Sequence, residues 1–312
     1  MRIVFMGTPD FAVPTLNALI NSGHNIVGVF TQPDKPKGRG YKLTPPPVKI
    51  CAIENGIQVF QPNSLKKGED AENALNKLKE LNPELIVVVA YGKLLPKEVL
   101  DVAKFGCINV HASLLPKYRG AGPIQWSVLN GEKETGVTTM LMAEGLDTGD
   151  MLLKASTEIL ENETASELHD RLSEIGAKLL IETITELEKG TLIPQKQDDR
   201  LSTYAPMLTK EMCSIDFEKS AQEIHNQIRG LADWPCATAI LNDKKIKIYK
   251  SELVSDKIIN AQAGMVIDEN NFIVACGIGF IKIVELQAEG GKRMSSKDYL
   301  RGNPISKASI LK

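Results

Sequence analysis

The sequence predicts an α/β protein that ends in a second, smaller β domain. Up to about residue 190, short apolar segments alternate with longer amphipathic ones, and after residue 209 short strand-like segments dominate. Alternating strands and helices are typical of a Rossmann-like, doubly wound and mostly parallel sheet. We therefore expect a Rossmann-like domain over residues 1–190, a linker over 191–208 and a β domain over 209–312.

Strands in the first domain are predicted where a short apolar segment is bounded by turn residues. The clearest is 85–90 (LIVVVA), whose β-branched run is typical of a strand buried on both faces. The other predicted strands are 2–6, 25–30, 58–60, 107–111, 137–142 and 151–157, the last two as an antiparallel pair. Apolar residues at helical spacing predict helices over 10–22, 48–54, 69–81, 96–103 and 164–189. The last helix opens with a capping-box pattern, Thr164-x-x-Glu167.

The second domain begins with one predicted helix, over residues 220–231. Five predicted strands follow it, over 237–241, 245–253, 264–267, 272–276 and 279–286. Several short strands at this spacing predict a small, OB-like β-barrel.

Composition excludes several classes of protein. A net charge of −2 gives no field of the kind found on general nucleic-acid or membrane binders. No apolar run reaches the roughly 20 residues of a membrane span, and the first residues lack a signal-peptide pattern, so a cytoplasmic protein is expected. The five cysteines and four histidines are scattered, which disfavours a disulfide framework and a metal site. Nothing indicates an obligate dimer, so we expect a monomer.

Ligands of a doubly wound sheet bind beyond the carboxyl ends of its strands. The turn Gly7-Thr8-Pro9-Asp10 after the first strand lacks the GxGxxG pattern, which disfavours a dinucleotide enzyme. Asn109 and His111 lie at positions i and i+2 near the end of an apolar strand, and therefore share one face. An amide can donate to a developing oxyanion and an imidazole can carry a proton, although each side chain could also simply cap a loop.

A compact acidic loop, 143–150 (AEGLDTGD), offers a partner for the histidine. Asp147 could orient His111, as carboxylates do beside catalytic imidazoles. Turns rich in Asp and Gly are common, so the loop alone is weak evidence. Its two glycines suggest backbone fitted closely around another group.

Together these segments resemble the active site of the folate-dependent formyltransferases. The pattern is Asn109-x-His111-x-Ser113-Leu-Leu-Pro116-x-Tyr118-Arg119-Gly120, followed by Gly145-x-Asp147-x-Gly149. Within that family, the segments 6–14, 31–49 and 61–65 are similar to members that formylate methionine on tRNA. The resemblance is specific up to about residue 205 and looser beyond it, where 229–237 (RGLADWPCA) is the best match.

The resemblance implies transfer of a formyl group from 10-formyltetrahydrofolate to the amino group of methionine on initiator tRNA, without a metal. It assigns catalysis to Asn109, His111 and Asp147. It places the folate pocket at three segments: Tyr91, Gly92, Lys93, Leu94 and Leu95; Ser113, Leu114, Leu115 and Pro116; and Ala143, Glu144 and Gly145. Leu94 and Leu95 could equally be core residues. Cys107 lies nearby but in an apolar strand, and we interpret it as core.

Residues 32–49 carry an excess of positive charge, with five basic side chains against one acidic one. Five prolines in this segment predict neither helix nor strand. A solvated loop would explain the charges, but a cationic loop can also bind phosphates of tRNA. For that role we single out Lys35, Lys37, Arg39 and Lys42.

Two alternatives remain open at this point. A formyltransferase acting on a small amine would share the catalytic trio without needing the basic segment or the second domain. A non-catalytic tRNA-binding protein on a Rossmann-like scaffold would leave the trio without a role.

Overall fold

The computed structural model describes residues 1–37, 41–255 and 261–312 and forms two compact units. Unit 1 consists of residues 1–120, 136–157 and 169–204. Unit 2 consists of residues 121–135, 158–168 and 205–312. No described helix is long and apolar enough to cross a bilayer.

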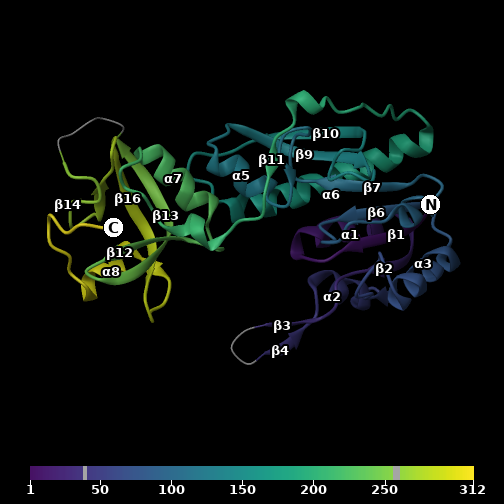
Figure 1. Cartoon of the computed structure of the whole chain (residues 1–312), viewed down its shortest axis with the longest axis horizontal. Helices are drawn as coiled ribbons and strands as arrows, with labels where there is room; N and C mark the ends of the chain where they lie inside the picture. Colours follow the sequence, from purple (N-terminus) through teal and green to yellow (C-terminus); the bar gives the residue numbers. More distant parts are fainter. Residues whose placement is uncertain (38–40, 256–260) are drawn as a thin grey trace. The chain divides into compact units, whose positions relative to one another are not determined.

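Unit 1 is built on a seven-stranded sheet with the order β10-β9-β7-β6-β1-β2-β5 (Figure 1). Its strands are β1 (Arg2–Gly7), β2 (Asn25–Phe30), β5 (Val59–Phe60), β6 (Leu85–Val89), β7 (Cys107–His111), β9 (Glu134–Leu141) and β10 (Met151–Glu158). Strand β1 runs parallel to β2 and β6, and β6 runs parallel to β7, whereas β9 is antiparallel to β7. The mostly parallel α/β sheet expected from the sequence is confirmed. The strand order reverses beside β1, where such sheets bind ligands.

Helices and the sheet of unit 1 enclose an apolar core. The helices are α1 (Val13–Asn21), α2 (Pro47–Glu54), α3 (Glu69–Leu81), α4 (Lys97–Leu100) and, from residue 169 onward, α6 (Ala165–Lys189), and η1 (Asp10–Ala12) is a short 3-10 turn. On one face, the inward residues of β1 and β6 pack with Ala74 and Leu78 of α3. This packing fixes the carboxyl ends of β1, β6 and β7, which lie next to one another in the sheet.

The expectation that residues 32–49 form neither helix nor strand is wrong. Strands β3 (Lys35–Lys37) and β4 (Lys42–Thr44) pair as an antiparallel ribbon, and α2 begins at Pro47. A two-stranded ribbon tolerates Pro36 because the missing N–H falls on an edge. Pro47 occupies the first turn of its helix, where the N–H would have no partner in any case.

Unit 2 carries an antiparallel sheet with the order β12-β13-β16-β15-β14 and β17 beside β16. The strands are β12 (Ala237–Leu241), β13 (Lys244–Ser255), β14 (Val266–Asp268), β15 (Ile273–Ala275), β16 (Phe280–Ala288) and β17 (Met294–Ser295). Its helices are α5 (Pro123–Leu129), α7 (Ala221–Gly230) and α8 (Ser296–Gly302), and η3 (Lys210–Cys213) is a 3-10 turn. Buried side chains of α7 and of the sheet form one apolar cluster. The last residues bond to two strands: Lys312 pairs with Ile240 of β12, and Ala308 and Ser309 pair with Val266 of β14.

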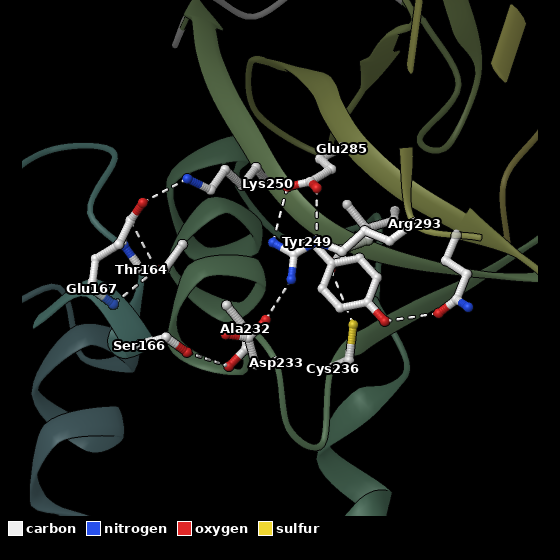
Figure 2. A network of polar contacts seen from close by, with 12 residues as sticks. Thr164, Ser166, Glu167, Ala232, Asp233, Cys236, Tyr249, Lys250, Glu285 and Arg293 are labelled. Atoms are coloured by element: carbon white, nitrogen blue, oxygen red, sulfur yellow. Dashed lines mark hydrogen bonds and ion pairs between the residues drawn. The ribbon is translucent and has the colours of Figure 1, made fainter. Parts of the chain in front are cut away.

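A network of polar contacts joins several segments of unit 2 (Figure 2). Its centre is the guanidinium of Arg293, which donates to Glu285 at 2.7 and 3.0 Å and to Asp233 at 2.6 Å. The same guanidinium lies 4.2 Å from the ring centre of Tyr249. Hydrogen bonds to Glu285 outweigh burial and raise the pKa of Arg293 further. The network therefore ties the loop at Asp233 to the sheet.

Candidate functional site

The site is centred on His111, the last residue of β7. Asn109 lies two residues earlier in the same strand, and both side chains are buried. The Nε2 atom of His111 lies 2.9 Å from the carbonyl oxygen of Tyr118. Because a carbonyl can only accept, Nε2 carries the proton and donates it to this bond.

Asp147 lies on the opposite side of the imidazole. Its Oδ2 atom is 3.7 Å from Nδ1 of His111 and accepts a hydrogen bond of 2.8 Å from the amide of Gly120. A gap of 3.7 Å is an ion-pair distance and too long for a hydrogen bond. His111 therefore has an acceptor near each ring nitrogen, an arrangement that can hold an imidazolium between a carbonyl and a carboxylate.

The loop that carries Asp147 has no room for a side chain at its two glycines. A Cβ on Gly149 would lie 1.7 Å from the carbonyl oxygen of Leu141, and one on Gly145 would lie 2.3 Å from Oγ1 of Thr148. Asp147 itself has a φ of 51°, in the left-handed region. The loop is thus packed closely against the end of β9 and against itself, and this packing holds the Asp147 backbone.

Sequence reasoning missed two residues that touch this centre, Gln197 and Thr203. Both lie in the predicted linker, where η2 (Asp199–Leu201) and β11 (Tyr204–Ala205) form. The side chain of Gln197 bonds to the carbonyls of Asp147 and Gly149, and Thr203 bonds to Tyr118. The only signal in the sequence is a polar residue type in a segment without periodicity, which does not distinguish it from a solvated linker.

The first predicted folate segment follows β6. Tyr91 is buried, and its hydroxyl has no hydrogen-bond partner among the described residues. Burial raises the pKa of this hydroxyl to about 12. The Tyr91 carbonyl accepts bonds of 3.0 Å from Oγ1 of Thr8 and from Nε2 of Gln32. Lys93 donates to the carbonyls of Pro62 and Asn63, so its ammonium secures a neighbouring loop.

The two leucines of this segment differ in their exposure to solvent. Leu95 is buried in the unit 1 core, whereas Leu94 is 54% exposed. Gly92 has a φ of 81°, which a residue with a side chain rarely adopts. Leu94 is therefore the apolar side chain of this segment that can meet a ligand.

The other predicted folate segments flank the His111 centre. Ser113 is fully buried, its hydroxyl donates to the Lys117 carbonyl, and its own carbonyl accepts from Thr138. Leu115 is buried as well, while Leu114 and Pro116 are partly buried. Ala143, Glu144 and Gly145 are exposed. The segments thus present mostly backbone and little side-chain chemistry.

A cleft of about 230 Å³ opens at the carboxyl ends of β1 and β2. Its lining includes Thr8, Gln32, Lys35 and the prolines of residues 45–47. Because Thr8 and Gln32 also bond to the Tyr91 carbonyl, the cleft adjoins the first folate segment.

The basic residues of 32–49 differ in their surroundings. Lys35 is exposed on β3, whereas Nζ of Lys49 bonds to Asp34 at 2.8 and 2.9 Å and to Gln61 at 2.8 Å. Hydrogen bonds from Gln61 and Lys49 lower the pKa of Asp34. Lys37 and Lys42 pair with each other through their backbones in the ribbon, while Arg39 lies outside the described residues.

The described residues hold five free cysteines, and none of them belongs to a group of metal-ligating side chains. All five thiols are free and buried, and burial raises the pKa of Cys107 to about 12. In residues 1–37, 41–255 and 261–312, no cluster of His, Cys, Asp or Glu could hold a metal ion.

Comparison with protein families assigns both halves of the chain. The family described as formyl transferase matches residues 1–184, and its C-terminal domain matches residues 207–304. The chain therefore belongs to the formyltransferase family, and it is a transferase.

Individual relatives indicate which members of this family the chain is similar to. The chain is 52% identical over 313 residues to a methionyl-tRNA formyltransferase of Caldanaerobacter subterraneus subsp. tengcongensis, with both chains fully covered. It is also 52% identical over 314 residues to a methionyl-tRNA formyltransferase of Clostridium novyi, again at full coverage. Over its whole length it is thus similar to the methionyl-tRNA formyltransferases.

Solved structures agree on the fold. An N-formyltransferase from Helicobacter canadensis, in complex with folinic acid and dTDP-3-aminofucose, matches with a TM-score of 0.69 at 24% identity, covering 90% of this chain and 98% of that one. HypX from Aquifex aeolicus, in complex with tetrahydrofolic acid, matches with a TM-score of 0.66 at 15% identity, covering 100% of this chain and 50% of that one.

Proposed function

We propose that the protein transfers the formyl group of 10-formyltetrahydrofolate to the amino group of methionyl initiator tRNA, giving N-formylmethionyl-tRNA for translation initiation. The observation that carries the proposal is the imidazole of His111, held between the Tyr118 carbonyl and the Asp147 carboxylate at the carboxyl end of a parallel strand. Family membership and full-length relatives named methionyl-tRNA formyltransferase support it.

The chemistry requires a donor for a developing negative charge and a route for a proton. When bound, the folate supplies the formyl group. The Asn109 amide donates to the formyl oxygen as negative charge develops there, and loss of one such donor costs about 3 kcal/mol of barrier. Because Nε2 of His111 is bonded to Tyr118, the Nδ1 proton of the imidazolium is the one left for that oxygen or for Asp147.

Asp147 holds the imidazolium by its charge, and a bridging water hydrogen-bonded to this carboxylate takes up the proton that the attacking amine releases. That proton then passes to the folate nitrogen that leaves. No covalent enzyme intermediate is needed, which agrees with the buried Cys107 thiol of the same strand, whose pKa is raised.

The folate pocket is proposed at the three segments named from the sequence. An unpartnered buried hydroxyl on Tyr91 and the exposed Leu94 offer one polar and one apolar contact. Residues 143–145 are exposed, and their backbone groups would add donors and acceptors for a polar ring. These features fit a flat, partly polar ligand.

The tRNA contacts are proposed on the ribbon of β3 and β4 and on the second domain. Lys35, Lys37, Arg39 and Lys42 would contact phosphates of the acceptor end. For residues 209–312 we propose an OB-like barrel, supported by the bonds that the last residues make to β12 and β14. Residues 1–190 would bind folate and carry catalysis, with 191–208 as the connection, in a monomer located in the cytoplasm beside its tRNA substrate.

A formylation assay with charged initiator tRNA tests the proposal. Wild-type protein, 10-formyltetrahydrofolate and methionyl-tRNA should give formylmethionyl-tRNA, and the Asp147→Asn variant should be slow. Formylation of a small amine in preference to methionyl-tRNA would replace the proposed substrate. Binding of tRNA without any formylation would contradict the catalytic assignment.

A further inference from the structure

Gln197 lies in the predicted linker, yet its side chain is buried at 6% exposure while its neighbours from 193 to 196 are exposed. Its Nε2 donates two hydrogen bonds, of 2.7 Å to the Asp147 carbonyl and 2.8 Å to the Gly149 carbonyl. Both acceptors belong to the loop that carries the Asp147 carboxylate. The buried amide therefore holds this loop at two points.

Arg119 fixes the orientation of that amide. Its Nε and Nη2 donate to Oε1 of Gln197 at 3.0 and 2.8 Å, and Nη2 also bonds to Asp199 at 2.8 Å. Because a guanidinium has only donors, the oxygen of Gln197 must face Arg119 and its nitrogen must face the two carbonyls. The amide has one orientation that satisfies all four of these hydrogen bonds.

The same segment holds the second partner of His111. The hydroxyl of Thr203 accepts from the amide of Tyr118 at 2.8 Å, and its carbonyl accepts from the amide of Arg119 at 2.9 Å. Tyr118 is the residue whose carbonyl accepts from His111. Residues 197–203 are thus bonded to both residues that flank the imidazole.

We infer that Gln197 is a positioning residue, which keeps the Asp147 carboxylate at its place beside His111. The inference rests on the proposed function, in which that carboxylate holds His111 and moves a proton. Gln197 acts through the backbone of residues 147–149 and contacts no reacting atom. A misplacement of about 1 Å at a reacting group can cost roughly a hundredfold in rate, so removal of both hydrogen bonds should appear in turnover.

The test compares Gln197→Met with a matched control, Gln195→Met. Gln195 lies two residues earlier with an exposed side chain, and its backbone pairs with Met151. We expect Gln197→Met to lower kcat for methionyl-tRNA formylation by about ten- to a hundredfold, with KM for both substrates within about twofold. The control should match wild type. An unchanged kcat in Gln197→Met would overturn the inference.

A double-mutant cycle with Asp147→Asn separates positioning from general destabilisation. If Gln197 acts through the Asp147 carboxylate, Gln197→Met should cost little further rate in the Asp147→Asn background. The same fold loss in both backgrounds would overturn the inference. Full activity of Asp147→Asn would instead contradict the proposed mechanism, whatever Gln197 does.

A milder variant keeps the test decisive if Gln197→Met unfolds. Arg119→Lys keeps the charge and lacks the forked pair of donors that orients the amide. It should lower kcat by a smaller factor than Gln197→Met does. In the Asp147→Asn background it should again cost little further rate. Wild-type kcat in a folded Arg119→Lys variant would count against the inference.

Discussion

The imidazole of His111 is the residue on which the proposed chemistry depends most directly. Replacing Asn109, His111 or Asp147 singly by alanine should lower kcat by about a hundredfold or more, because each change removes a charge, donor or proton route specific to the transition state. His169→Ala is the matched control, since that imidazole is partly exposed on α6 and bonds to Asp170.

Steady-state formylation kinetics, together with thermal unfolding of each variant, checks this prediction. The fold and the tRNA affinity should remain close to wild type in all four variants. Near wild-type turnover for His111→Ala would contradict the mechanism.

At the scale of residues, the sequence allowed us to predict site residues whose side chains themselves suggest a chemical role. Asn109 and His111 could be found because alternation along one strand places them on a shared face. Gln197 and Thr203 could not, because they act on carbonyls and amides of residues about 50 to 85 positions away. Backbone contacts across such separations leave no pattern in one sequence.

At the scale of elements, helix ends were easier to predict than helices without a polar face. The capping box Thr164-x-x-Glu167 forms as predicted, with bonds of 2.9 and 2.8 Å to the Glu167 carboxylate. Strand β7 and helix α3 have the predicted bounds. Helix α5 was missed because PIQWSVL is short and buried over much of its length, so it shows no amphipathic period.

Figure 2 shows the Glu167 carboxylate in contact with Lys250 and Thr164. These contacts give the cap a pH dependence. Burial opposes its ionisation, but bonds from Lys250 at 2.6 Å and from Thr164 outweigh it and lower the pKa of Glu167 from 4.5 to about 2. A lowered pKa in the folded state means that the ionised carboxylate stabilises the fold above about pH 4.5. This contribution is lost as the pH falls from about 4.5 toward 2.

We therefore expect Glu167→Gln to be less stable than wild type at pH 7 and to approach it as the pH falls to 2. Urea unfolding at a series of pH values measures the difference. Glu182→Gln, on an exposed position of the same helix, is the control and should show no such convergence. A difference between wild type and Glu167→Gln that stays constant with pH would contradict the assignment.

The ribbon of β3 and β4 makes a separate prediction for tRNA. Lys35→Ala should weaken tRNA use, because it removes a cation that can neutralise a phosphate from an exposed strand, and should leave folate affinity unchanged. The slope of log K against log salt should fall by about one for each phosphate that the variant no longer neutralises. Arg39→Ala carries the same expectation from the sequence, with a cost of about 1–3 kcal/mol.

Binding titrations at several salt concentrations check the slope, with Lys178→Ala on α6 as an exposed control. Equal slopes for wild type and Lys35→Ala would favour the simpler interpretation of a solvated ribbon. Loss of folate binding in Lys35→Ala would instead place the ribbon on the folate side of the site.

At the scale of the whole molecule, each of the two units encloses an apolar core of its own. One lies against the parallel sheet of unit 1 and the other between α7 and the antiparallel sheet of unit 2. The change in hydrophobic pattern near residue 200 predicted two parts. It could not predict that residues 121–135 and 158–168 belong to unit 2, because membership of a core is decided by contacts between distant segments.

Buried cysteines in both units report on how these cores open. Cys51 and Cys107 lie in unit 1, and Cys213, Cys236 and Cys276 lie in unit 2. Burial raises the pKa of Cys107 and Cys276 to about 12 and that of Cys236 to about 11. Because the thiolate is the nucleophile, labelling of these thiols requires local or global opening.

A folate analogue that binds only folded unit 1 should slow labelling there. At a concentration of 100 times its Kd it stabilises the folded state by about 2.7 kcal/mol, which corresponds to roughly a hundredfold slower labelling when opening is at equilibrium. If the two cores open independently, Cys107 should be protected by this factor while Cys276 labels at its unliganded rate. Mass spectrometry of peptides after pulses of iodoacetamide measures both rates in one sample. Equal protection of both cysteines would show that the cores open as one cooperative unit, and no protection of Cys107 would contradict the folate site proposed in unit 1.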